Sequence, residues 1–301
     1  MRHRPLATQS RLHRSLCSAV HFAFLFTVSL AAGCQRPTVA VLTYGPAPAV
    51  ATNAPANGAV DLSPAVDVLR WRLKRLPCRV ALGAPGEIRV EVFEDNTRTL
   101  EKIDRLVCSA GTFELRIAAN QTDHADLIER AEASQQREIR DESDRLMAWW
   151  VPIDPNANED LLSLQGLAIR ETERLGIRCS ELLVVNDPYR VDGSLLERAS
   201  RDVDHQGRPK VNFVLSPKGG KMMHGLTTDN LPDEIHHHTR QLAIILNNRV
   251  IAAPAIRSTI AERGEITGNF TEEQVAELVE VLNAGSLPVP LRRIHVSRSG
   301  E

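Results

Sequence analysis

The sequence predicts an α+β protein, built from half-buried strands and amphipathic helices that follow one another along the chain. Apolar and polar residues alternate over residues 88–93, which is the period of a strand with one buried face. Near the C-terminus, Thr271 and Gln274 have the spacing of a helix capping box. Behind them, apolar residues recur at helical spacing over residues 275–282. Both kinds of element are therefore expected in one chain.

Composition indicates a globular protein and argues against some partners. The chain has 301 residues, 43% of them apolar, which is enough for one large or two modest domains with their own cores. Its 36 basic and 38 acidic residues give a net charge of -2. A chain so close to neutral has no overall field that attracts nucleic acid or an anionic membrane. No nucleic-acid partner is expected.

The N-terminus has the layout of a secretory signal, because four arginines precede an apolar segment over residues 17–33. Residues 29–34 read Ser-Leu-Ala-Ala-Gly-Cys and resemble a bacterial lipobox, although the leucine lies one position further from the cysteine than is usual. We therefore predict a signal peptide with lipobox over residues 1–34, lipid attachment at Cys34, and export to the periplasmic side with anchoring to a membrane. An ordinary cleaved signal and an uncleaved anchor are the alternatives, although the segment is short for a span of about 20 residues.

A Pro/Ala-rich tether is predicted over residues 35–60, with a first strand inside it. Ser63 is then expected to cap a helix with Pro64 at its first position, and Pro77 to end it. The elements that follow complete the order βαββαβ, which is a ferredoxin-like layout. They are strands over 39–43, 80–82, 88–93 and 113–117, and helices over 63–76 and 97–109.

A second group of elements is predicted beyond residue 118. Asn247-Asn248 separates two apolar runs, which indicates a two-residue hairpin, and Pro254 ends its second strand. Gly285 is placed to end the C-terminal helix. The other expected elements are helices over 122–136 and 194–201, a helix starting at 216–217, and strands over 148–152, 177–185 and 211–215.

The C-terminal third of the chain resembles the SecD family, the accessory subunit of the bacterial protein-export translocon. The resemblance is carried by the hairpin, by Ile-Thr-Gly-Asn-Phe at 266–270, and by Ala-Gly-Ser-Leu-Pro at 284–288, with a strand-to-helix match at 211–217. It implies a ferredoxin-like base with an inserted α+β head, as in the family's periplasmic domain, here without the family's transmembrane helices. The implied base covers residues 61–118 and 269–297, and the implied head covers 119–268.

The resemblance also implies a role and partners. The family role is to bind or guide unfolded preprotein on the far side of the inner membrane, with Sec translocon subunits as partners. The alternative is a structural or interaction lipoprotein that retains the fold without an export role. One mild departure favours this alternative: Asn247 stands where the family commonly has an aspartate.

No motif indicates catalysis, a cofactor or a metal. Residues 218–221 read Lys-Gly-Gly-Lys, but the first glycine of a phosphate loop is missing. Residues 202–207 begin like a calcium loop, yet Phe213 occupies the position of the last acidic ligand. The three histidines at 236–238 point to alternate sides of an extended segment, so one ion cannot use all three. We predict a non-enzymatic protein and interpret these segments as a helix start, a polar turn and a solvated loop.

Four large side chains are candidates for polypeptide contact: Trp149, Trp150, Met222 and Met223. Flat rings and flexible thioethers suit varied apolar segments. The simpler interpretation is that each belongs to the core.

The cysteines allow a disulfide in an exported protein. Cys78 follows the first predicted helix and Cys108 ends the second, so parallel neighbouring helices would bring the two thiols together. The simpler alternative is that these two and Cys179 are buried as free thiols.

Overall fold

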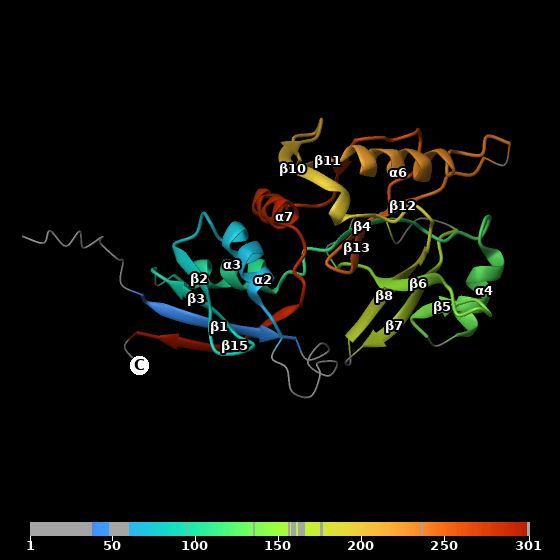
Figure 1. Ribbon diagram of the computed structural model, residues 1–301. Helices are drawn as coiled ribbons and strands as arrows, with labels where there is room; N and C mark the ends of the chain where they lie inside the picture. Colours follow the sequence, from blue (N-terminus) through green and yellow to red (C-terminus); the bar gives the residue numbers. More distant parts are fainter. Residues whose placement is uncertain are drawn as a thin grey trace, which may run out of the picture. The chain divides into compact units, whose positions relative to one another are not determined.

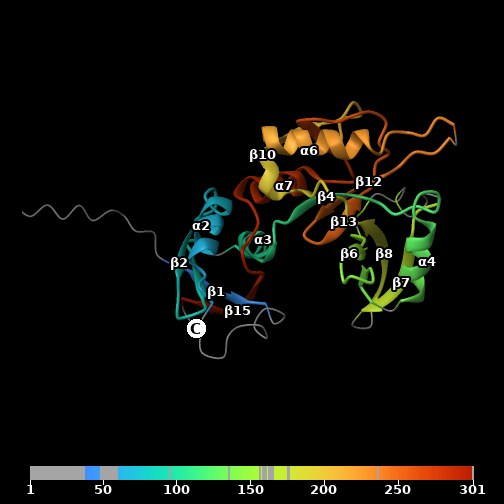
Figure 2. The same ribbon diagram turned by 45° about the vertical axis from the view of Figure 1, so that its right-hand side comes forward.

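The computed structural model describes residues 38–47, 60–94, 96–134, 136–155, 157, 161, 166–174, 177–235 and 237–299. Residues 37–301 form one unit, drawn in Figures 1 and 2. The predicted signal peptide, Cys34 and most of the predicted tether lie outside the described residues.

The elements of the N-terminal part, with the last strand, form a layer that we call the base. They are β1 (Ala40–Pro46), α2 (Ser63–Arg72), β2 (Cys78–Leu82), β3 (Ile88–Val92), α3 (Thr97–Cys108) and β15 (Leu291–Arg298). The sheet is antiparallel with the order β15-β1-β3-β2, and α2 and α3 cover one of its faces (Figure 1). The predicted α+β class and the ferredoxin-like order are confirmed, with β15 as the fourth strand.

One strand assignment was wrong. Residues 113–117 were expected to complete the base sheet. That strand, β4 (Phe113–Ile117), pairs instead with β12 (Leu242–Leu246), and β15 lies beside β1. Alternation of apolar residues identifies a strand but not its partner, which here comes from a distant part of the chain.

Helix α2 also differs in its limits. Leu62 is its N-cap residue, and Asp61 accepts a hydrogen bond of 2.9 Å from the backbone N–H of Ser63. Ser63 is therefore the first helical residue rather than the cap. The helix ends at Arg72, ahead of Pro77.

Arg72 fastens the base to the two chain segments that leave and re-enter it. Its side chain is 1% exposed and donates hydrogen bonds to the carbonyl oxygens of Leu106 (2.9 Å), Ser109 (2.6 Å) and Gly285 (2.7 Å). Burial lowers the pKa of Arg72 to about 10, so it still carries its charge at neutral pH. Gly111, at φ +72°, passes so close that a Cβ there would lie 2.2 Å from the guanidinium.

Apart from α7, which contacts both parts, the other described elements form a part that we call the head, which contains three sheets. Their orders are β13-β12-β4-β9, β10-β11-β14 and β5-β6-β8-β7. The bounds are α4 (Ala125–Ala133), β5 (Glu138–Arg140), β6 (Leu146–Pro152), β7 (Ile169–Arg174), β8 (Ile177–Val185), β9 (Val191–Asp192), β10 (Leu196–Val203), β11 (Pro209–Leu215), α6 (Pro217–Thr228), β13 (Arg249–Ala252), β14 (Arg263–Ile266) and α7 (Glu272–Ala284).

Several head elements were predicted, one expected helix was wrong, and four strands, β5, β7, β9 and β14, were not predicted. The hairpin is confirmed, with Asn247 and Asn248 at φ +50° and +61°, and α7 has the expected capping box. Residues 194–201, expected as a helix, form a 3₁₀ turn followed by β10. Asp192 accepts a hydrogen bond from the backbone N–H of Ser194, as at a helix start, but pairing with β11 keeps the following residues extended.

Helix α7 lies between the base and the head (Figure 2). Val281 belongs to the base core, whereas Val275 and Leu282 belong to the main core of the head. The two parts therefore share one helix.

The predicted disulfide is not present, since Cys78 and Cys108 are both free thiols. Cys78 begins β2, at one edge of the base sheet. Cys108 lies beside Arg293 of β15, at the opposite edge. Helices α2 and α3 do lie side by side, but the two thiols lie at opposite edges of the base sheet and therefore do not meet. Burial raises the pKa of Cys78 to about 11.

Candidate functional site

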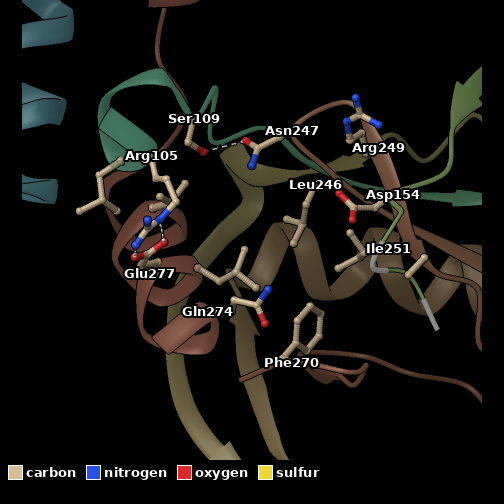
Figure 3. Close-up of a pocket in the computed structure, with 14 residues that line it drawn as sticks. Arg105, Ser109, Asp154, Leu246, Asn247, Arg249, Ile251, Phe270, Gln274 and Glu277 are labelled. Atoms are coloured by element: carbon tan, nitrogen blue, oxygen red, sulfur yellow. Dashed lines mark hydrogen bonds and ion pairs between the residues drawn. The ribbon is translucent and has the colours of Figure 1, made fainter. Parts of the chain in front are cut away.

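A cleft of about 420 Å³ opens where α3, the β12–β13 hairpin and α7 meet, and we call it the junction cleft (Figure 3). Its apolar lining is Leu106, Ala157, Leu246, Ile251, Phe270, Leu278 and Val281. Its polar lining is Arg105, Ser109, Asp154, Asn247, Arg249, Gln274 and Glu277. A mainly apolar hollow with polar groups around it is the ordinary form of a binding site.

The hairpin is fixed to the base at one side of this cleft. The Asn247 side-chain oxygen accepts hydrogen bonds from the Ser109 hydroxyl (3.0 Å) and from the backbone N–H of Gly111 (2.7 Å) (Figure 3). Asparagine tolerates the positive φ that this turn requires. The same residue therefore forms the turn and joins the head to the segment leaving the base.

Ion pairs form the other side of the cleft. Arg105 of α3 pairs with Glu277 of α7 at 2.7 Å, and Arg98 pairs with Glu273 at 3.1 Å. The hydrogen bond to Glu277 raises the pKa of Arg105. These contacts tie α7 to the base where the apolar lining begins.

A larger hollow of about 630 Å³ lies between the sheets β10-β11-β14 and β13-β12-β4-β9, and we call it the head groove. Its apolar lining includes Leu115, Phe213, Met223, Leu242, Ile244, Ile256 and Ile260. Its charged lining is Arg198, Lys210, Arg263 and Glu265. Lys210 pairs with Glu265, so the two arginines leave the groove with net positive charge.

Strand β14 forms one wall of the head groove and has a free edge. Leu215 donates its backbone N–H to the Glu262 carbonyl, which sets the phase of the antiparallel β11–β14 ladder. In that phase Arg263 and Glu265 form non-hydrogen-bonded pairs with β11, so their N–H and C=O groups point outward. No described strand pairs with this edge.

The opposite edge of the same sheet is covered. Asn283 of α7 accepts a hydrogen bond from the Ala199 N–H (2.8 Å) and donates one to the Ala199 carbonyl (2.9 Å). The side-chain amide thus replaces a neighbouring strand at β10. Because exposed edges invite pairing with other chains, the contrast between the two edges singles out β14.

The four predicted contact residues do not form one cluster. Trp150 and Met223 are 0% and 1% exposed, and Trp150 lies under Arg170, 4.3 Å from its ring centre. Trp149 is half-buried against a different hydrophobic core, and the guanidinium of Arg116 lies over its ring. Met222 is half-buried against the main head core. Met223 lines the head groove, so it is the one member of the set that lies at a hollow described here.

The other segments singled out in the sequence have structural positions. Residues 218–221 lie in α6, and residues 204–207 form the turn between β10 and β11. His238 contacts Asp123 at 3.0 Å, whereas His236 lies outside the described residues. The part of the chain that the structure describes contains no cluster of three metal-ligating side chains.

The site residues that the sequence did not reveal are Asn283 and the β14 edge. In the sequence, Asn283 looks like an ordinary polar residue of an amphipathic helix. Whether a strand lies at the edge of a sheet depends on the order of the strands in that sheet, which the sequence does not show. The one available signal was Gly264, because a glycine inside a strand marks close approach of another group. That group is Phe213, whose ring would lie 2.4 Å from a Cβ at Gly264.

Comparison with known proteins places these features in a family context. Residues 172–289 match the family model described as SecDF, P1 head subdomain. The chain is 39% identical over 102 residues to the protein translocase subunit SecD of Aquifex aeolicus, covering 34% of this chain and 19% of that protein. It is 28% identical over 244 residues to the SecD of Elusimicrobium minutum, covering 80% of this chain and 47% of that protein.

Solved structures give the same fold. The chain matches a crystal structure of SecDF in its super-membrane-facing form with a TM-score of 0.55 and 23% identity, over 86% of this chain and 30% of that one. It matches a second structure, of a membrane component SecDF that enhances protein export, with a TM-score of 0.53 and 23% identity, over 85% of this chain and 98% of that one.

This chain spans less than half the length of the curated relatives given above. Among the helices that the structure describes, none is both long enough and apolar enough to cross a bilayer.

Proposed function

We propose that the chain, as a SecD-family periplasmic domain, is a non-enzymatic accessory protein of preprotein export. In this role it binds unfolded polypeptide on the periplasmic side of the inner membrane and works with subunits of the Sec translocon. An N-terminal lipid at Cys34 holds it to a membrane.

One observation carries the polypeptide-binding part of this proposal, namely the free edge of β14 beside the head groove. An extended chain added to a strand edge is held by main-chain hydrogen bonds, which do not depend on its sequence. An export accessory meets many different sequences, so recognition through the backbone fits the role.

The lining of the groove defines the segment that fits. In an added strand, successive side chains point to opposite faces. One set enters between the sheets, among Leu115, Ile244 and Ile256, and the other set lies on the side of Arg198 and Arg263. The groove therefore favours an extended segment in which apolar residues alternate with acidic or polar ones.

The junction cleft offers a second apolar contact for the same chain. Phe270 and Leu278 line it, and both also pack against the main head core. A client too long for the head groove can continue there. Binding at the β14 edge does not depend on this contact in the junction cleft.

A proline at position 265 tests the strand-edge mode. The Glu265 N–H points away from β11, so Glu265→Pro removes an outward donor and leaves the ladder hydrogen bonds in place. Glu265→Ala is the matched control, since both variants lose the pair with Lys210. We expect Glu265→Pro to weaken binding of a labelled valine–glutamate alternating peptide roughly tenfold relative to Glu265→Ala. Fluorescence anisotropy measures the affinity, and equal affinity in both folded variants refutes the mode.

The export role needs a separate test in cells. A photo-crosslinking residue at position 263 should capture translocating chains or translocon subunits, whereas one at Glu129, on the exposed side of α4, should not. Capture of neither at position 263 excludes the export role. It would favour the alternative, a structural lipoprotein that retains the fold.

A further inference from the structure

The base sheet has a second face, which no described element covers. The side chains of Leu42, Ile88 and Val90 point toward α2 and α3. Side chains point alternately to the two faces of a sheet, and directly paired residues share a face. The register therefore places the following residues on the open face: Val41, Thr43, Arg79, Ala81, Arg89, Glu91, Arg292, His295 and Ser297. Figure 1 shows the helices on the other side of the sheet.

The charge on this open face is positive. Arg79, Arg89 and Arg292 are exposed, and none forms an ion pair with another described residue. Glu91 is the one carboxylate that the register places among them. The net charge of -2 for the whole chain thus hides a local basic surface. Other basic residues of the base, such as Arg105, are paired with α7.

The middle of the open face is partly apolar. Val41 and Ala81 are small side chains, and a Cβ added at Gly45 would lie 3.6 Å from the Ile294 side chain, which is 43% exposed. No groove is present among the hollows described above at these residues. A flat face with exposed arginines around small apolar groups suits a broad surface rather than a single extended chain.

The position of this face in the chain indicates which surface it meets. Cys34, the predicted lipid attachment site, precedes Ala40 by six residues. Six residues reach at most about 20 Å when fully extended. A lipid at Cys34 therefore keeps the start of β1 within about 20 Å of the phospholipid headgroups.

We propose that the open face of the base sheet binds the anionic phospholipid surface of the membrane to which the chain is anchored. Arginines near such a surface each increase partitioning by roughly fivefold, so three of them give on the order of a hundredfold. The face adds a contact to the lipid anchor at Cys34 and fixes the orientation of the base on the bilayer.

Vesicle binding by the unacylated chain tests this proposal. The mature chain carrying Cys34→Ala is mixed with vesicles containing phosphatidylglycerol or with vesicles of phosphatidylcholine alone. We expect binding to the anionic vesicles only, and its loss at high salt, because screening weakens exposed charges. Co-sedimentation measures the bound fraction. Equal binding to both vesicles, or binding to neither, overturns the proposal.

Matched triple variants assign the binding to this face. Charge reversal in R79E/R89E/R292E should lower partitioning on the order of a hundredfold. The control R178E/R201E/R257E changes the net charge equally at exposed head positions and should leave most of the binding intact. R79K/R89K/R292K should keep it, since lysine preserves the charge. Equal loss in the reversal and control triples overturns the proposal, as does anionic-vesicle binding that the reversal triple retains. Peptide affinity at the head groove is measured separately and reports only on the proposed function.

Discussion

At the scale of single residues, Asp123 holds together two segments that are far apart in the sequence. Its carboxylate accepts two hydrogen bonds from Arg240, both at 2.9 Å, one from Asn120 at 2.9 Å, and a contact from His238 at 3.0 Å. Burial alone would raise the pKa of Asp123, but the hydrogen bonds from Arg240 and Asn120 lower it to about 2. The turn before α4 is thereby joined to the segment before β12.

The depressed pKa of Asp123 predicts how its contribution depends on pH. Because the folded-state pKa lies below the unfolded value, the stabilisation is fully present above pH 4 and is lost as pH falls toward 2. We expect Asp123→Asn to lower the free energy of unfolding by about 1–2 kcal/mol at pH 7, after allowance for partial exposure. The difference from the native chain should shrink between pH 4 and pH 2. Urea unfolding measures both, with Glu129→Gln as an exposed control on α4.

A constant difference across that pH range would contradict this account of Asp123. It would mean that the asparagine disturbs packing rather than an ion pair. An equal loss in Glu129→Gln would likewise show that the effect belongs to α4 as a whole.

At the scale of elements, the β12–β13 hairpin has both a local and a tertiary role. Two apolar runs around two asparagines predict the hairpin from sequence alone. The bonds from Ser109 and Gly111 to Asn247 could not be predicted, because the partners come from the end of α3. The asparagine at this position is therefore explained by the contact with the base as well as by the turn.

Glycine substitutions separate the two roles of the hairpin. Asn247→Gly keeps the positive φ accessible but removes the acceptor of two hydrogen bonds, so we expect a loss of about 1–2 kcal/mol in the free energy of unfolding. Asn248 also has a positive φ, but among the described residues its side chain makes no hydrogen bond to the base, so Asn248→Gly should change stability by less than about 0.5 kcal/mol. Chemical denaturation compares them, and equal losses would refute the tertiary role of Asn247.

The elements also show where sequence reasoning succeeds and where it ends. Strands with clear alternation and the capped helix α7 were predicted because their signals are local. The partner of β4 and the extended state of β10 were not, since both depend on pairing with strands elsewhere in the chain. The β14 edge was missed for the same reason: a strand becomes an edge only through the order of its sheet.

At the scale of the whole molecule, α7 makes the base and the head interdependent. Two adjacent residues of this helix pack in different cores: Val281 packs in the core of the base, and Leu282 packs in the core of the head. Ion pairs from Arg98 and Arg105 add to the base side, but exposed pairs each contribute only about 0–1 kcal/mol. The buried side chains of α7 therefore dominate the coupling.

This arrangement predicts that damage to the head side of α7 is felt in the base. Leu282→Ala should cost about 2–4 kcal/mol, because it opens a cavity in the head core. If base and head unfold as one unit, hydrogen exchange should speed up equally in peptides covering β3 in the base and β11 in the head. The same pattern is expected for Val281→Ala, whose cavity lies on the base side. Faster exchange in β11 alone after Leu282→Ala would show two independent units, and α7 would then be a linker that merely touches both cores.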